Sequence, residues 1–374
     1  MLRCFLASSI ICVALFLPCK AWALEPGDVS WRTLGKEQGF WGGSVTCIIQ
    51  DRRGLVWIGA AGGLYRYDGH SFAVFKPDPG RNSLLSSSIS AVLEDKTGDL
   101  WVGTDGGGLA RYKTLAGTFT SVALPADEAE AVASLRIAAL AMDEEGRVIA
   151  GTAEGYVYRI DPSDNKVAVL SRPGLSHEPV TSLLVDSKGR LWAGTNGGGL
   201  LCWISEGAPA SRYIHDNGRK DSISSDHVSA IIEDSLGFVW IGFSDSGIDL
   251  VEDGRFSHAK RDGERGGPLP AVLSLAEDIK GQIWAGFHDG GIGILDPSRM
   301  EATVSFFAGG AEVTTLVRDR RGLMWMGLDR GGLLTGDLRS TTFSRYPVSS
   351  EGKPLGAIQA IAETSLNGIV IASH

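Results

Sequence analysis

The sequence of 374 residues has no stripe of basic residues, no helical periodicity and only five cysteines. Its net charge is −9, and surfaces that bind nucleic acid concentrate Lys and Arg, so nucleic acid is not an expected partner. Apolar residues do not recur at the 3.6-residue period of amphipathic helices. They form short runs rich in Val, Ile, Leu and Trp, which favour β-strands.

The motifs of common catalytic and metal sites are also missing. There is no H-x-x-x-H or C-x-x-C spacing for a metal and no G-x-S-x-G for a nucleophilic serine. The stretch "GTDGGG" (103–108) lacks the Lys and the following helix of a phosphate-binding loop. We therefore expect no metal, no cofactor and no catalytic residue that a motif identifies.

The N-terminal residues have the pattern of a secretory signal peptide. A short basic start (1–3) precedes an apolar stretch (4–18) and the A-x-A cleavage pattern "AWA" (21–23). The alternative, an uncleaved anchor, needs about 20 apolar residues to span a bilayer, and this stretch is shorter. We expect cleavage after Ala23, export to the periplasm and no membrane span in the mature chain.

What the sequence has in excess is glycine, 50 residues in all, within a phrase that recurs along the chain. "LVWIGAAGGLYRY" (55–67), "DLWVGTDGGGLARY" (99–112) and "FVWIGFSDSGIDLV" (238–251) are three copies. The aligned positions, 41–48 residues apart, are Trp57, Trp101, Ile149, Trp192, Trp240, Trp284, Trp325 and Ile371. Repeats of this length suit the four-stranded blade of a β-propeller.

One repeat shows the expected strands: 88–95, 99–104, 108–113 and 117–122, named A to D from the centre outward. The sequence therefore predicts an all-β fold, a seven-bladed β-propeller of four-stranded antiparallel blades. The signal peptide covers 1–23, the propeller 24–346, and 347–374 begins an eighth, incomplete repeat. "VSWRTLG" (29–35) resembles a strand D that pairs with the last blade. An eight-bladed ring, or the first of two propellers, remains the alternative.

Two repeated residue types are predicted to be structural. The tryptophans fill the space between blades, where a large flat side chain buries much surface. The aspartates of the A–B hairpins, in the pattern Asp-x-x-Gly, accept backbone hydrogen bonds in the turn. These aspartates are Asp51, Asp95, Asp143, Asp186, Asp234, Asp278 and Asp319. Cys47 and Cys202 fall in distant blades and are predicted to be free, buried thiols.

The repeat resembles the two-component regulator propeller repeat, V-x-x-I-x-E-D-x-x-G-x-L-W-I-G-T-x-x-G-G-L-x-R-Y. Segments 45–69 and 228–251 follow it closely, and the resemblance covers nearly all of the mature chain. It implies a periplasmic propeller that binds a signal, followed by a linking domain, a membrane helix and a histidine kinase or diguanylate cyclase. No motif of these later parts is present, so we expect a truncated or split sensor.

Candidate binding residues lie where the repeat varies, in the B–C turns and D–A connections that a propeller gathers on one face. In the B–C turns they are Asp105, Glu154, Asn196, Asp245, His288, Asp289, Asp329 and Arg330. In the D–A connections they are Phe40, Trp41 and His227, of which the aromatics stand outside the repeated tryptophan position. Asp and Asn are also good turn formers, and the aromatics suit packing on the closing blade as well as sugar stacking.

Three functions follow as hypotheses. The first is an exported sensor module that binds a small molecule or oligosaccharide and works with a membrane signalling protein. The second is a propeller lyase or hydrolase that uses His288 and nearby acids. The third is a scaffold that binds another protein through the same face. Under the first hypothesis we expect the effector domain to be missing from this sequence, so that the residues present supply only ligand binding.

Overall fold

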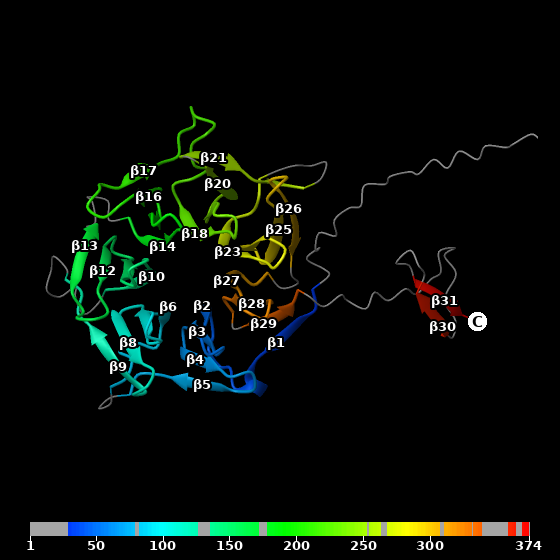
Figure 1. The fold of residues 1–374 in the computed structure, drawn as a ribbon, viewed down its shortest axis with the longest axis horizontal. Helices are drawn as coiled ribbons and strands as arrows, with labels where there is room; N and C mark the ends of the chain where they lie inside the picture. Colours follow the sequence, from blue (N-terminus) through cyan, green and yellow to red (C-terminus); the bar gives the residue numbers. More distant parts are fainter. Residues whose placement is uncertain are drawn as a thin grey trace, which may run out of the picture.

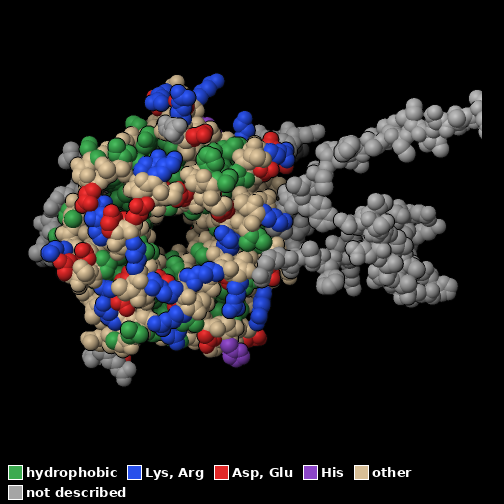
Figure 2. Space-filling model, viewed as in Figure 1, with side chains coloured by type: hydrophobic (Ala, Val, Ile, Leu, Met, Phe, Trp, Pro, Cys, Tyr) green, Lys and Arg blue, Asp and Glu red, His purple; other side chains and the backbone are tan. Residues whose placement is uncertain are grey.

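The structure is a computed structural model. The residues that it describes are 29–78, 82–125, 135–171, 178–252, 254–262, 268–306, 310–330, 332–338, 358–363 and 369–373. Those between 29 and 338 form a closed ring of seven sheets, blades 1 to 7, whose four main strands are antiparallel, around a central channel (Figures 1 and 2). The predicted seven-bladed, all-β propeller is therefore confirmed. Among these residues, no helix is long and apolar enough to cross a membrane.

The strands follow chain order from the channel outward. Blade 1 consists of β2 (Val45–Gln50), β3 (Val56–Ala60), β4 (Gly63–Tyr67) and β5 (Phe72–Phe75). Blade 2 consists of β6 (Ile89–Glu94), β7 (Leu100–Thr104), β8 (Leu109–Lys113) and β9 (Thr118–Val122). Blade 3 consists of β10 (Ile137–Met142), β11 (Val148–Thr152), β12 (Val157–Ile160) and β13 (Val167–Ser171).

Blades 4 and 5 continue this order. They consist of β14 (Val180–Val185), β15 (Leu191–Thr195), β16 (Leu200–Trp203) and β17 (Ser211–Tyr213); and β18 (Val228–Glu233), β19 (Val239–Phe243), β20 (Ile248–Glu252) and β21 (Arg255–His258). Blade 6 consists of β23 (Val272–Glu277), β24 (Ile283–Phe287), β25 (Gly291–Asp296) and β26 (Glu301–Phe306). The short β22 (Lys260–Arg261) adds a fifth, parallel strand to its outer edge, which the sequence did not predict.

The N-terminal strand closes the ring. Blade 7 takes β27 (Val313–Arg318), β28 (Leu323–Leu328) and β29 (Leu333–Asp337) from the end of the propeller, and its outer strand is β1 (Trp31–Leu34). Strand β1 runs antiparallel to β29, so the first and last described strands of the ring lie side by side (Figure 1). A single turn of 3₁₀ helix, η2 (Lys36–Gln38), then leads into blade 1. The predicted closure is confirmed.

The incomplete repeat does not join the ring as an eighth blade. Its strands β30 (Ile358–Glu363) and β31 (Ile369–Ser373) pair with each other in a separate two-stranded sheet. The alternative of an eight-bladed ring is therefore wrong. The predicted signal peptide, residues 1–23, and the segment 339–357 lie outside the described residues.

The repeated tryptophans form the core between neighbouring blades. Buried apolar side chains gather into seven clusters, each between one blade and the next. Trp101 of blade 2, for example, shares a cluster with Ile137 and Tyr158 of blade 3. All six tryptophans at the repeated position are at most 3% exposed, which confirms their structural role.

Each of these indoles is also held by the aspartate of the preceding A–B hairpin. The indole Nε1 donates to the aspartate Oδ2 at 2.8–3.1 Å in the pairs Trp57–Asp51, Trp101–Asp95, Trp192–Asp186, Trp240–Asp234, Trp284–Asp278 and Trp325–Asp319. The other oxygen accepts N–H groups of the turn, such as those of Leu236 and Phe238 on Asp234. The turn role was predicted; the indole bond was not.

Blade 3 has Ile149 where the other blades have tryptophan, and arginines replace the indole as donors. Arg147 Nε donates to Asp143 Oδ2 at 2.8 Å, and Arg159 Nε lies 3.5 Å from the same oxygen. Ile149 itself is fully buried in the cluster between blades 3 and 4. The carboxylate therefore keeps its partners although the aromatic ring is gone.

The glycine of strand B lets adjacent blades approach closely. In all seven blades, a Cβ added to this glycine would come within 2.8 Å of a side-chain carbon of the first strand A residue in the next blade. For Gly103 this neighbour is Ile137, and for Gly327 it is Val45, across the closure of the ring. The phrase W-x-G therefore combines a side chain that fills the interface with a position that must have none.

The two cysteines of the propeller are free, as predicted. Cys47 lies on β2 of blade 1 and is partly buried, and Cys202 lies on β16 of blade 4 and is buried. Burial raises the pKa of each thiol to about 11. Both are therefore protonated at neutral pH.

Candidate functional site

The B–C turns and D–A connections meet on one face of the ring, as expected. Asn196, in the B–C turn of blade 4, forms an isolated β-bridge with His227, which lies just before strand A of blade 5. The Gly197 N–H donates to the Asp226 carbonyl at 3.0 Å. Gly197 has a φ of 99°, which a residue with a Cβ rarely adopts, so the glycine is needed for this turn.

Three of the predicted residues lie on this face at the junction of blades 4 and 5 and form side-chain hydrogen bonds there. His227 Nδ1 lies 2.7 Å from Asn196 Oδ1, so the imidazole nitrogen donates to the amide oxygen. Asp245, in the B–C turn of blade 5, accepts a hydrogen bond from the Ser225 hydroxyl at 2.9 Å. Ser225 lies in the same D–A connection as His227. The sequence analysis found Asn196, His227 and Asp245 but missed their serine partner.

A second polar group lies between blades 6 and 7. His288 Nε2 is 3.2 Å from Glu312 Oε1, and its Nδ1 is 3.7 Å from the adjacent Asp289. Asp329 Oδ1 accepts the backbone N–H of Glu312 at 3.0 Å, and Arg330 pairs with Asp329 at 3.3 Å. Glu312 thus links the B–C turns of both blades. It directly precedes strand A, as His227 does, and that position was the signal by which it could have been found.

A third group joins blades 2 and 3. Arg136, just before strand A of blade 3, lies 3.4 Å from Glu154 and 3.9 Å from Asp105. Asp105 and Glu154 belong to the B–C turns of successive blades and were both predicted; Arg136 was not. All three side chains are at least 30% exposed, so solvent screens this contact and a ligand can reach it.

The two predicted aromatics of the first D–A connection have different environments. Trp41 is 65% exposed, with the Lys36 ammonium 5.2 Å from its ring centroid. Phe40 is only 3% exposed and packs against Tyr65 and Phe72 at centroid distances of 4.9 and 5.4 Å. Phe40 therefore packs on blade 1, which is the packing alternative that the sequence left open, and its buried ring is not available to stack on a ligand. Trp41 keeps an open aromatic face.

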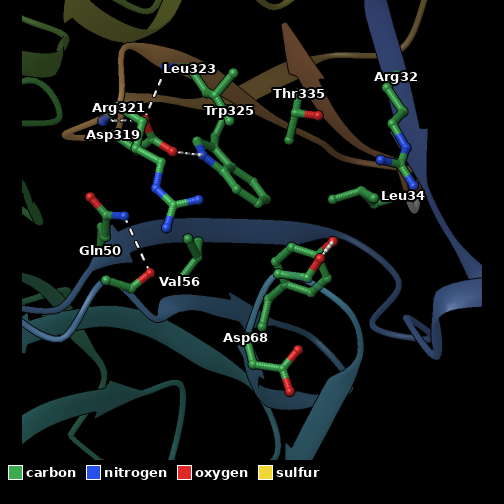
Figure 3. A pocket seen from close by; sticks show the side chains of 13 residues that line it. Arg32, Leu34, Gln50, Val56, Asp68, Asp319, Arg321, Leu323, Trp325 and Thr335 are labelled. Carbon is green, nitrogen blue, oxygen red and sulfur yellow. Dashed lines mark hydrogen bonds between the residues drawn. The ribbon is translucent and has the colours of Figure 1, made fainter. Parts of the chain in front are cut away.

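This face can bind through hydrogen bonds and one aromatic surface. The three groups present carboxylates, imidazoles, an amide and guanidinium groups at the blade junctions. Within the described residues, no three His, Cys, Asp or Glu side chains come together as metal ligands. Two cavities among the described residues lie elsewhere. One lies between blades 7 and 1 (Figure 3), and the other lies beside β17 and β21 at the outer edge.

The fold and its closure define a seven-bladed β-propeller. Three of its repeats match the family model of the two-component regulator propeller, at residues 39–62, 83–106 and 174–197. Each match covers strands A and B of one blade, in blades 1, 2 and 4. The chain therefore carries two-component regulator propeller repeats, as the sequence analysis predicted.

Several solved structures share this fold. The extracellular domain of the hybrid two-component system BT3049 from B. thetaiotaomicron is 19% identical, with a TM-score of 0.70, over 92% of this chain and 46% of that one. Virginiamycin B lyase from Staphylococcus aureus, solved with quinupristin, is 13% identical, with a TM-score of 0.63, over 83% and 99%.

PorZ, a surface component of the type-IX secretion system of Porphyromonas gingivalis, is 17% identical, with a TM-score of 0.63, over 86% of this chain and 52% of that one. At these identities the likeness shows the fold alone. The chain spans about half the length of the two-component domain that it matches, 46%. No curated protein matches the sequence.

Proposed function

We propose that the chain is the exported sensor propeller of a two-component or cyclic-di-GMP signalling protein. It binds a small polar molecule, such as a glycan fragment, on the face of the B–C turns and D–A connections. The observation that carries the proposal is the set of polar contacts across blade junctions, above all Asn196–His227 and His288–Glu312. The repeat family and the fold shared with a two-component extracellular domain support it.

The chemistry of this face suits a ligand with several hydroxyl groups. His288 is 55% exposed and Trp41 is 65% exposed, so both reach solvent beside the paired carboxylates and amides. A sugar offers hydroxyls to the polar groups and an apolar ring face to an indole. A ligand that contacts two blades at once also favours one packing of those blades over another, which is what a sensor must pass to its membrane partner.

The first test is thermal unfolding of the purified chain with a panel of oligosaccharides, amino acids and antibiotics. A ligand that binds only the folded state stabilises it by RT ln(1 + [L]/Kd), about 2.7 kcal/mol at a hundredfold excess over Kd. Trp41→Ala and His227→Gln should reduce the shift. His70→Gln, in the C–D turn of blade 1 on the opposite face, is the control and should keep it. If no ligand gives a shift, a protein partner is favoured and the small-molecule proposal fails.

A lyase is the second candidate, because His288 lies between Glu312 and Asp289. An imidazole that contacts two carboxylates has the arrangement of a general acid–base pair, with the carboxylates orienting the ring. The same panel separates this candidate from the sensor, because the ligand is recovered and analysed after incubation. A ligand recovered intact supports the sensor. A ligand recovered cleaved, with cleavage lost in His288→Gln, supports the enzyme.

A further inference from the structure

The junction between blades 7 and 1 contains a cavity that differs from the proposed binding face. It encloses about 200 Å³ and is lined by Arg32, Leu34, Val56, Tyr67, Arg321 and Trp325, among others (Figure 3). The A–B turn of blade 7 and the C–D turn of blade 1 form part of its wall, so it opens on the face opposite the B–C turns. It lies where β1 closes the ring.

The cavity exists because blade 7 has a short side chain on strand C at the position that faces the repeated tryptophan. In each blade the residue at the repeated tryptophan position faces one residue on strand C, as the strand registers show. This residue is Arg66, Arg111 or Arg159 in blades 1 to 3, Cys202, Leu250 or Ile294 in blades 4 to 6, and Thr335 in blade 7. In blades 1 and 2 the arginine stacks on the tryptophan, 5.7 and 5.2 Å from the ring centroid.

In blade 7 the arginine lies on the outermost strand, β1, and not on strand C as it does in blades 1 to 3. Thr335 is too short to cover the Trp325 ring, and the residue directly opposite Thr335 on β1 is Arg32. In the other blades this outermost position holds only Ala, Ser or Thr, such as Ala73 in blade 1. The space that a strand C side chain fills elsewhere is therefore open here, between an apolar wall and an outer guanidinium.

Two unpaired cations border this space. Within the described part of the chain, the guanidinium groups of Arg32 and Arg321 have no hydrogen-bond or ion-pair partner, and Figure 3 shows Arg321 reaching in beside Trp325. The two acids of the lining are already engaged. Asp319 accepts from the Trp325 indole and from two N–H groups of its turn. Asp68 accepts from His70 and Ser71, and its carboxylate points away from the arginines in Figure 3.

The surrounding surface strengthens the positive potential. The A–B turns of both blades read Asp-Arg-Arg-Gly, at 51–54 and 319–322. Arg52 pairs with Glu94 of blade 2, so the other three arginines of these turns remain to add positive charge. Figure 2 shows Lys and Arg side chains gathered around the channel opening over blades 7, 1 and 2. Clustered cations raise the local concentration of anions and favour their binding.

We propose that this cavity binds a small organic anion, with its carboxylate at Arg321 and a flat apolar body over Trp325, toward Arg32 at the other end of the cavity. Guanidinium groups match carboxylates in charge and geometry, and an apolar wall beside them favours a planar hydrocarbon ring. This site goes beyond the sensor proposal, because it lies on the opposite face and uses none of the same residues. Its ligand contacts β1 and blade 1 together and therefore stabilises the closed ring.

Benzoate is the probe, and benzamide, of the same shape without the charge, is its matched control. Calorimetric titration of the purified chain should give saturable binding of benzoate and much weaker binding of benzamide. Arg321→Gln should weaken benzoate about tenfold or more, since a bond to a charged group is lost. Arg53→Gln, the position in blade 1 that corresponds to Arg321, should leave the affinity unchanged.

Thr335→Leu tests the cavity itself. Blade 5 carries Leu250 at this position, so the variant should fold and should fill the space over Trp325. Its unfolding curve should show equal or greater stability, and benzoate binding should be lost. Trp41→Ala, on the proposed sensor face, should bind benzoate normally, which separates the two proposals. The inference is overturned if benzoate does not saturate at about 10 mM, if benzamide binds equally well, or if Thr335→Leu and Arg321→Gln keep full affinity.

Discussion

Gly103 of blade 2 lies against Ile137 of blade 3, and a Cβ at Gly103 would be 2.6 Å from the isoleucine Cγ2. Real Cβ atoms do not approach so closely, so the blades would have to separate. Because seven such contacts share one closed ring, a shift at one junction must be taken up by the others. Gly103 lies within strand B, and its lack of a side chain is a packing requirement of the fold.

Gly103→Ala is therefore expected to destabilise the protein by about 1–3 kcal/mol, the usual cost of overpacking a rigid core. Urea unfolding followed by tryptophan fluorescence measures the change. Gly35→Ala is the control, since nothing lies within 4 Å of its added Cβ, and it should change stability by less than about 0.5 kcal/mol. Equal stability of Gly103→Ala and the unmodified protein would contradict the close approach.

The aspartate–tryptophan pair predicts a strong coupling. Asp234→Asn replaces one carboxylate oxygen by an NH₂ group, which cannot accept a hydrogen bond. The bond that is lost is either the one from Trp240 Nε1, at 2.8 Å, or those from the N–H groups of the turn. A buried donor without an acceptor costs about 1–3 kcal/mol. In a Trp240→Phe background that donor is gone, so Asp234→Asn should cost less.

A double-mutant cycle of unfolding free energies measures the coupling between Asp234 and Trp240. Additive single effects would show that the hydrogen bond contributes nothing. Asp143 of blade 3 is the natural comparison, because its carboxylate accepts from Arg147 in place of an indole.

His258 predicts that stability falls as pH rises. Its Nδ1 is 2.7 Å from Asp249, which is fully buried, and its Nε2 is 3.0 Å from the Lys220 carbonyl, so both ring nitrogens face acceptors. The bond to Asp249 raises the pKa of His258 above its ordinary value. Because the folded protein binds this proton more tightly than the unfolded chain does, protonated His258 stabilises the fold. This stabilisation is fully present below about pH 6.5 and is lost as pH rises through the folded-state pKa.

The unfolding free energy should therefore decline as pH rises above about 6.5, and the decline should be smaller in His258→Gln. His215 contributes in the same direction, because bonds to the Ile223 carbonyl and Asn217 raise its pKa. His70→Gln, with an exposed imidazole, serves as control and should keep the full decline. A pH dependence that is identical in the His258 and His70 variants would rule out the role of His258.

The two propeller cysteines should resist alkylation in the folded protein. Burial raises the pKa of Cys47 and of Cys202 to about 11. The reactive thiolate is therefore roughly a hundredfold scarcer than at an ordinary cysteine. Iodoacetamide at pH 8 should label the two peptides slowly in buffer and quickly in denaturant, as mass spectrometry can follow. Recovery of a peptide that joins Cys47 to Cys202 would contradict the blade assignment.

Local chemistry made the blades predictable. In blade 2 the expected strands 88–95, 99–104, 108–113 and 117–122 agree with β6 to β9 to within a residue at each end. Alternating apolar residues and Asp-x-x-Gly turns act over a few neighbours in the chain, so the sequence shows them directly. Because the same pattern recurs along the chain, the strands of the other blades could be predicted by aligning the repeats.

Contacts between residues of different repeats could not be predicted from the sequence in the same way. Glu312, Arg136 and Ser225 acquire their roles only when two loops lie side by side, and no local pattern states which loops meet. Phe40 illustrates the limit, because it turns inward over Gly42, whose added Cβ would be 2.7 Å from its ring. The next residue, Trp41, turns outward. The displaced arginine of blade 7 likewise depends on the register between β1 and β29.

Strand β1 is synthesised before every other described strand, yet its partner β29 is among the last of the ring. The Thr314 hydroxyl reaches the Val45 carbonyl, and the Arg320 N–H reaches Gln50, across 269 and 270 residues of chain. Contacts so distant in sequence form late, and an edge strand that waits for its partner can pair with another chain. Two newly made chains that meet before closure can therefore exchange their β1 strands, each completing blade 7 of the other.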